Sequence, residues 1–168
     1  MARFVVLGAG DPQFQESLKI VSSQYPEAID VVIGFDEVLA HLIQAAADIL
    51  LMPSQYEPCG LAQLYAFRYG TIPIVRATGG LVDTVVNVSD QTCADGTASG
   101  FVFDAFEPAA LEAAVRRAID AHGNTKLWQD LIRGVMQQDW SWDVSARKYQ
   151  EVFSQARANA PVDVVDVR

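Results

Sequence analysis

The stretch from Asp48 to Ala77, "DILLMPSQYEPCGLAQLYAFRYGTIPIVRA", carries the clearest evidence for the fold. It begins with a short apolar run at 49–52 and ends with a second one at 72–76, and both are typical of buried strands. Between them, Leu61 and Tyr65 lie on one side of a predicted helix. A strand, a helix and a second strand in this order predict two parallel strands joined by a crossover helix.

Pro73 lies inside the second apolar run. Proline has no amide hydrogen to donate to a neighbouring strand, so we predict that this strand either starts at Pro73 or lies at a sheet edge.

The same alternation continues on both sides of this unit. Apolar runs rich in β-branched residues predict further strands at 3–10, 29–35 and 100–103. Helices are predicted at 11–25, after a capping Asp36, at 79–86, from Pro108, at 124–136 and after Ser141, and a polar loop at 89–99. Strands that alternate with helices predict an α/β fold: a Rossmann-like open parallel sheet with helices on both faces.

Composition limits the classes of protein to consider. The chain has 168 residues, 51% of them apolar, enough for one domain with a sizeable core. We expect that domain to cover 1–158 and to be followed by a loosely ordered tail at 159–168. No apolar run is long enough to span a membrane, and the net charge of −9 argues against nucleic-acid binding. With only two cysteines, the sequence predicts a reducing, cytoplasmic location.

The turns that follow the predicted strands carry most of the glycine and carboxylate residues. They are Gly8–Asp11, Gly34–Asp36, Ser54–Gly60 and Ala77–Gly80. In open parallel sheets, ligands bind at the carboxyl ends of the strands, where these turns meet. We therefore expect one ligand-binding crevice on that edge of the sheet.

The segment "EPCG", Glu57 to Gly60, is the most specific of these turns. Gly60 has no side chain, so a ligand can approach the backbone closely. The free amides of Cys59, Gly60 and Leu61 at a helix start can donate to oxygen atoms, and the Glu57 carboxylate can accept from sugar hydroxyls or face a positive charge. A surface glutamate before a proline-initiated helix is the plainer interpretation.

Two other glycine-rich turns are weaker signals. Gly8-Ala9-Gly10 begins like a dinucleotide-binding motif, but Gln13 takes the place of the third glycine, so a tight turn is favoured over NAD binding. Thr78-Gly79-Gly80 taken alone indicates a tight turn with a threonine cap.

The remaining reactive side chains show no catalytic pattern. Neither His41 nor His122 falls near Cys59, so we interpret this thiol as inert or ligand-facing and both histidines as structural. No spacing predicts a metal site, and we expect no cofactor. The three tryptophans, at 128, 140 and 142, are typical of core packing.

The segment 53–85, "PSQYEPCGLAQLYAFRYGTIPIVRATGGLVDTV", resembles the signature region of bacterial glycogen synthases and plant starch synthases. The segments "VVLGAGDPQFQ", "ADILLMPS" and "DWSWDVSARKYQEVF" resemble the same family in the same order. The resemblance covers nearly the whole chain except the last dozen residues. It implies the carboxyl-terminal, donor-binding half of a GT-B fold, the two-Rossmann-domain architecture of these retaining glycosyltransferases.

The resemblance also implies an activity and a set of site residues. The family transfers glucose from ADP-glucose, or sometimes UDP-glucose, to an α-1,4-glucan without a metal. Glu57 matches the carboxylate beside the donor glucose, and Cys59, Gly60 and Leu61 match the amides that hold sugar and phosphate. Tyr65 matches the aromatic residue near the nucleotide, and Thr78, Gly79 and Gly80 match the loop that faces the donor. The expected location is the cytoplasm, or a plastid in a plant.

Compared with the family pattern, parts are absent. Ala62 stands where many relatives carry a hydroxyl that can reach a phosphate. The family's acceptor-binding domain precedes this half, which then opens with a strand and a helix that carry an arginine and a lysine for the diphosphate. This chain resembles the half from its second strand onward, so we expect a central strand to be lacking between 5–7 and 49–52. We therefore expect negligible transfer by this chain alone, and completion by the preceding domain or by a partner chain. The alternative is a non-catalytic module that binds nucleotide-sugar or glucan, or that assembles with a partner.

Overall fold

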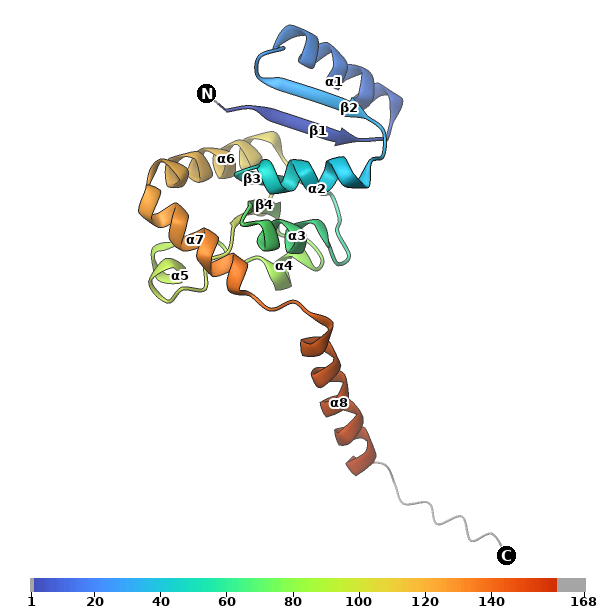
Figure 1. Ribbon diagram of the computed structural model, residues 1–168, viewed down its shortest axis with the longest axis vertical. Coiled ribbons are helices and arrows are strands. Elements are labelled where there is room, and N and C mark those ends of the chain that lie inside the picture. The colour runs from blue at the N-terminus through green and yellow to red at the C-terminus, as the bar shows by residue number, and fades with distance from the viewer. Residues whose placement is uncertain (1, 160–168) are drawn as a thin grey trace, which may run out of the picture. The chain divides into compact units, whose positions relative to one another are not determined.

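The computed structural model describes residues 2–159 (Figure 1). It divides into two compact units, Met1–Met136 and Gln137–Arg168. The strands are β1 (Phe4–Gly8), β2 (Ile29–Ile33), β3 (Ile49–Met52), β4 (Ile72–Arg76) and β5 (Phe101–Phe103). The helices are α1 (Pro12–Gln24), α2 (Glu37–Ala46), α3 (Ala62–Tyr69), α4 (Leu81–Thr84), α5 (Asp90–Ala94), α6 (Pro108–Gly123), α7 (Thr125–Gln137) and α8 (Trp142–Asn159).

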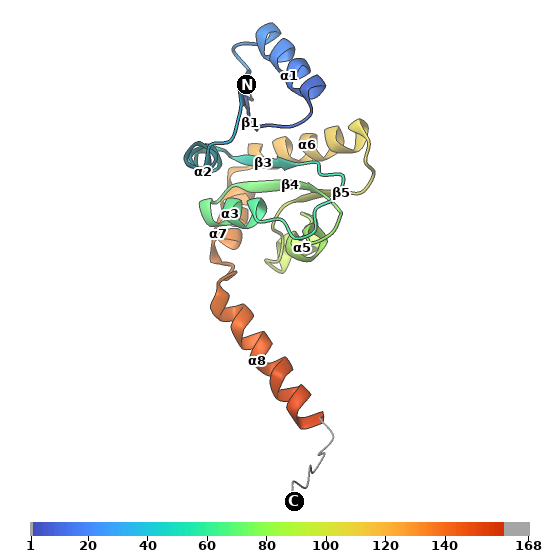
Figure 2. The same ribbon diagram turned by 90° about the vertical axis from the view of Figure 1, so that its right-hand side faces the viewer.

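Three parallel strands in the order β3-β4-β5 form the centre of the first unit. Leu51 pairs with Ile74, and Ile74 pairs with Phe101 on the other side. Figure 2 shows α6 on one face of this sheet and α3 on the other. Ile72, Ile74 and Val75 of β4 have no exposed surface, because helices cover both faces of the strand. The predicted α/β architecture is therefore confirmed.

Pro73 lies in the central strand, so the predicted edge position is wrong, and it is the second residue of β4 because the strand starts one residue earlier, at Ile72. Pro73 pairs with Leu50 of β3, whereas the ladder to β5 begins one residue later, at Ile74. Proline is tolerated here because β5 requires no hydrogen bond from it.

Strands β1 and β2 form a separate parallel sheet, with Val6 opposite Val31. Helix α1 packs along β2 (Figure 1). Phe4 and Val5 are 42% and 47% exposed, although they lie in a strand of the buried, parallel type. Within residues 2–159, no strand pairs with the second edge of β1 or with the free edge of β3. The break in the sheet thus falls where a strand was expected to be lacking.

Side-chain caps fix the helix starts that lead away from β1 and β2. The Asp11 carboxylate accepts from the Gln13 amide at 2.7 Å, and the Asp36 carboxylate accepts from the Leu39 amide at 2.9 Å. The predicted cap at Asp36 is confirmed.

The segment predicted as a loop at 89–99 contains the short helix α5, so that prediction is wrong. Ser89 and Thr92 form a reciprocal cap: the Thr92 amide donates to the Ser89 hydroxyl at 3.2 Å, and the Ser89 amide donates to the Thr92 hydroxyl at 2.9 Å. A threonine fills the place that glutamate or glutamine takes in the usual capping box.

The second unit contains α8, whose apolar side chains are exposed. Trp142 is 84% exposed and Phe153 is 64% exposed, whereas Trp128 of α7 is buried. Core packing is therefore correct for Trp128 and wrong for Trp140 and Trp142. Of the predicted tail at 159–168, only Asn159 is described, and it ends α8. None of the described helices combines the length and the apolar character that crossing a bilayer requires.

Candidate functional site

Two loops follow the carboxyl ends of β3 and β4 and lie against each other. The first, 53–61, carries Glu57, and the second, 77–80, carries Thr78, Gly79 and Gly80. The Gly80 amide donates to the Glu57 carbonyl oxygen at 3.0 Å and to the Pro58 carbonyl oxygen at 3.2 Å. The predicted site residues from the two loops are thus brought together by backbone contact.

The glycines of the second loop are required by that contact. A Cβ atom at Gly79 would lie 1.9 Å from the Glu57 carbonyl oxygen, and Gly79 has a φ of +49°. A Cβ atom at Gly80 would lie 2.6 Å from the Cys59 carbonyl oxygen. Gly80, rather than Thr78, is the residue before the first turn of α4, so the predicted threonine cap is wrong. Any larger residue would force the two loops apart.

Gly60 is a glycine for a different reason from the predicted one. It has a φ of +71°, and a Cβ atom there would lie 2.4 Å from Oε1 of Gln63. Gly60 itself is buried. The missing side chain makes room for Gln63, so close approach by a ligand is not needed to explain this glycine.

The first loop presents unused donors beside an unused carboxylate. Within the described residues, the amides of Cys59, Gly60 and Leu61 have no acceptor, and the Glu57 carboxylate has neither a hydrogen bond nor an ion pair. Glu57 is half-buried and Cys59 is exposed, so a ligand in solvent can reach both. Free amides at the start of a helix bind anions, and a fixed carboxylate stabilises a neighbouring positive charge.

Arg76, which ends β4, holds the first loop from the side. Its Nε donates to the Ser54 carbonyl oxygen at 2.9 Å, and its guanidinium also donates to the carbonyl oxygen of Gln55. Nη1 reaches the Asp104 carbonyl oxygen at 3.4 Å, and the guanidinium lies 5.5 Å from the Phe106 ring centroid. This arginine therefore joins the loops that follow β3 and β5. The sequence offered no periodic signal for this role.

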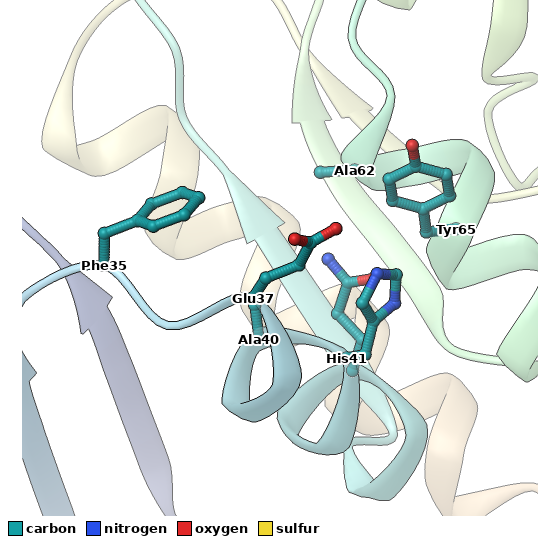
Figure 3. A pocket seen from close by; sticks show the side chains of 7 residues that line it. Phe35, Glu37, Ala40, His41, Ala62 and Tyr65 are labelled. Carbon is teal, nitrogen blue, oxygen red and sulfur yellow. The ribbon is translucent and has the colours of Figure 1, made fainter.

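A cavity of about 320 Å³ lies beside the start of α3 (Figure 3). Helix α2 contributes Glu37, Ala40, His41 and Gln44, the segment before it contributes Phe35, and α3 contributes Ala62 and Tyr65. In Figure 3 the Glu37 carboxylate, the His41 ring and the Tyr65 ring border the same space. Ala62, which lines the cavity, follows Leu61 directly in the chain.

His41, which lines this cavity, contacts two tyrosines, and one of them, Tyr65, also lines it. The His41 ring lies 5.4 Å from the Tyr65 ring, and its Nδ1 lies 3.2 Å from the Tyr69 hydroxyl. The histidine predicted to be structural thus has structural contacts and also lines the cavity.

The described residues hold no group of three or more histidine, cysteine, aspartate or glutamate side chains that could bind a metal ion. Cys59 and Cys93 are both free thiols. The first loop therefore offers a ligand backbone amides and the Glu57 carboxylate, and the cavity adds the polar side chains of Glu37, His41 and Gln44.

Comparison with known proteins gives consistent similarities. The sequence profile of the family described as "Glycosyl transferases group 1" matches residues 1–133. The glycogen synthase of Nitrosomonas eutropha is 47% identical over 153 residues, which are 91% of this chain and 30% of that protein. Glycogen synthase 1 of Methylococcus capsulatus is 46% identical over 168 residues, which are 99% of this chain and 34% of that protein.

Among solved structures, the catalytic domain of starch synthase IV from Arabidopsis thaliana, bound to ADP and acarbose, superposes with a TM-score of 0.82. It is 34% identical, and the match covers 94% of this chain and 33% of that chain. This chain thus spans about a third of the length of each of these three relatives.

Proposed function

Because this chain belongs to the family of group 1 glycosyl transferases, we propose that it is the donor-binding part of a hexosyltransferase of the glycogen and starch synthase type. The reaction would transfer glucose from ADP-glucose or UDP-glucose to an α-1,4-glucan, with retention of configuration. One observation carries the proposal: the loop that follows β3 holds both the Glu57 carboxylate and the amides of Cys59, Gly60 and Leu61, all without a partner within residues 2–159, and the loop that follows β4 bonds to it.

Each part of this arrangement suits one part of a nucleotide-sugar. The leaving diphosphate is an anion, and the start of α3 offers it free amides and the positive end of the helix dipole. Breaking the glycosidic bond builds positive charge on the sugar ring, which the Glu57 carboxylate would stabilise. Gly79 and Gly80 contact that carboxylate's loop, and together with Thr78 they would border the donor sugar.

The cavity beside α3 is suited to the nucleobase. It adjoins Leu61 through Ala62, and the Tyr65 ring offers an apolar face on which a planar base can stack. The ADP in the starch synthase structure supports an adenine nucleotide as the donor. Glycogen synthases among the relatives support a glucan acceptor. Two free cysteines support a cytoplasmic location.

We propose that the chain alone transfers glucose negligibly. The loop segments 53–61 and 77–80 contain no lysine or arginine, and the guanidinium of nearby Arg76 is engaged by backbone carbonyls. Positioning of the acceptor and neutralisation of the diphosphate would each lower the barrier by several kcal/mol, on the order of 3–10. Both contributions would come from a preceding domain or from a partner chain.

Radiolabelled ADP-glucose, glycogen and the purified chain test this proposal. We expect saturable ADP-glucose binding by calorimetry and no label in glycogen above a protein-free blank. Robust label transfer by the chain alone would contradict the proposal that another domain or chain is needed for transfer. Absence of any ADP-glucose binding, together with binding of another nucleotide class, would contradict the donor assignment.

A second candidate function is that of an assembly module, which the divided sheet favours. The unpaired edges of β1 and β3 expose backbone groups that usually bond to another strand. A partner polypeptide that supplies a parallel strand would complete one continuous sheet. Light scattering after size-exclusion chromatography tests this: a dimer or a stable complex supports it, and a monomer that binds ADP-glucose counts against it.

A further inference from the structure

Gln63, in the first turn of α3, is a fully buried polar side chain that touches the candidate site from behind. It has no exposed surface. Its Nε2 donates to the Gly60 carbonyl oxygen at 2.9 Å and to the Cys59 carbonyl oxygen at 3.3 Å. The same nitrogen lies 3.2 Å from the Thr84 hydroxyl of α4. The side-chain amide of Gln63 thus bonds both to the first loop, 53–61, which carries Glu57, and to α4, which follows the second loop.

Thr84 continues this contact to the second loop. Its hydroxyl accepts from Gln63 and donates to the Gly80 carbonyl oxygen at 2.9 Å. Gly80 in turn donates its amide to the Glu57 carbonyl oxygen. The bonds form a closed circuit that runs from Gln63 to Thr84, Gly80 and the Glu57 loop.

Packing alone does not explain a glutamine at this position. Its Oε1 is buried and has no donor among the described residues. A buried acceptor without a partner is destabilising, and a methionine would fill the same volume without that cost. The feature that a methionine would lack is the Nε2 donor, so the donor is the part that needs a function.

That donor fixes the direction of the free amides. The chain has no cis peptide bond among the described residues, and in a planar trans peptide the carbonyl and the N–H point in opposite directions. The Cys59 carbonyl shares a peptide plane with the Gly60 amide, and the Gly60 carbonyl shares one with the Leu61 amide. Because both carbonyls bond to Gln63, both amides point away from it.

We propose that Gln63 is a positioning residue, which with Thr84 turns the Gly60 and Leu61 amides outward to bind the diphosphate of a nucleotide-sugar. The identity of this ligand rests on the proposed function above, whereas the orientation of the amides does not. Gln63 acts through the backbone and does not itself touch the ligand.

The test compares variants of the full chain labelled with nitrogen-15. Gln63→Met keeps the volume and removes the donor, and Thr84→Val removes the hydroxyl that Thr84→Ser keeps. Ser99→Ala is the matched control: Ser99 is fully buried, and its hydroxyl accepts from the Val86 amide at 2.8 Å, outside both loops. Three quantities are measured: the melting temperature, hydrogen exchange of the Gly80 amide relative to β4 amides, and affinity for ADP-glucose.

We expect Gln63→Met to raise the relative exchange of the Gly80 amide and to weaken ADP-glucose binding, each by about tenfold. Thr84→Val should also raise the exchange of the Gly80 amide and weaken ADP-glucose binding, by smaller factors. Thr84→Ser should keep both quantities at their wild-type values. Ser99→Ala should lower the melting temperature without changing either of the other two quantities. If Gln63→Met changes exchange and affinity by less than about twofold, or if Ser99→Ala changes them equally, the positioning role is wrong.

The two proposals fail separately. If the wild-type chain shows no saturable ADP-glucose binding, the donor assignment fails. The positioning role is then tested by the relative hydrogen exchange of the Gly80 amide in Gln63→Met: a rise of about tenfold supports the role, and a change of less than about twofold contradicts it.

Discussion

The Gly80 amide donates to the Glu57 carbonyl oxygen, and this bond of 3.0 Å couples the two loops of the candidate site. It holds the Glu57 backbone, while the Glu57 side chain makes no hydrogen bond or ion pair within residues 2–159. The backbone that carries this carboxylate thereby gains a fixed position, and a preorganised charge is what electrostatic stabilisation of a reaction requires.

Gly79→Ala should separate the loops. The new Cβ would lie 1.9 Å from the Glu57 carbonyl oxygen, in addition to the strain of a positive φ. Gly96→Ala is the matched control, because Gly96 has a φ of +74° but no atom within 4 Å of the added Cβ. We expect Gly96→Ala to cost about 1 kcal/mol of unfolding free energy and Gly79→Ala at least ~2 kcal/mol more, with loss of ADP-glucose binding. Equal losses in urea unfolding would show that the loops do not depend on this contact.

Glu57→Gln should abolish transfer without affecting stability. The carboxylate makes no hydrogen bond or ion pair within residues 2–159, so its neutralisation removes no native contact. In the complete enzyme we expect kcat to fall by about 100-fold or more, with the melting temperature within about one degree of the wild-type value. Asp83→Asn, an exposed acid on α4, controls for the change in net charge. If the variant keeps more than about a tenth of the wild-type activity, Glu57 has no catalytic role in the reaction.

Arg76→Met should loosen the loop at 53–56. The variant removes charged hydrogen bonds to the carbonyl oxygens of Ser54 and Gln55 and the contact with Phe106, and we expect a loss of about 1–3 kcal/mol. Arg116→Met, which breaks an exposed pair with Glu112, should cost less than about 0.5 kcal/mol. Urea unfolding and limited proteolysis provide the measurements. Arg76→Met that is as stable and as protease-resistant as Arg116→Met would contradict the role.

Tyr65→Ala should weaken nucleotide binding more than Tyr65→Phe does. The ring borders the cavity and lies 5.4 Å from the His41 ring, whereas no described contact involves the Tyr65 hydroxyl. We expect Tyr65→Phe to bind ADP within about twofold of the wild-type affinity and Tyr65→Ala to lose about tenfold, as the loss of one stacking face predicts. Calorimetric titration with ADP gives both affinities. If the two variants bind ADP with equal affinity, the nucleobase does not stack on the Tyr65 ring.

The order of elements and the edge of the sheet that carries the site were predictable from the sequence. Short apolar runs, Asp36 before α2 and Pro108 at the start of α6 are local signals, and the βαβ rule then gathers the loops at one edge. Helix α5 was missed because Thr92 replaces the usual glutamate of a capping box.

The reasons for the glycines could not be predicted, because they depend on contacts between distant residues. Gly79 approaches Glu57, 22 positions earlier in the chain, and Gly60 accommodates Gln63. The buried position of Gln63, in contrast, could have been predicted from the sequence. Gln63 shares the buried face of α3 with Ala66 and Phe67, and a polar residue on an apolar face indicates a buried hydrogen-bond partner. Arg76 left no such signal, since its partners are backbone atoms of two other loops.

The donor site can be tested by adding ADP-glucose to the nitrogen-15-labelled chain and following the amide resonances. Saturable shifts are expected at the amides of Cys59, Gly60 and Leu61 and in the loop at 77–80, with the resonances of α5 unmoved. Saturable shifts confined to other parts of the chain, or no saturable shift at those amides, would contradict the donor site.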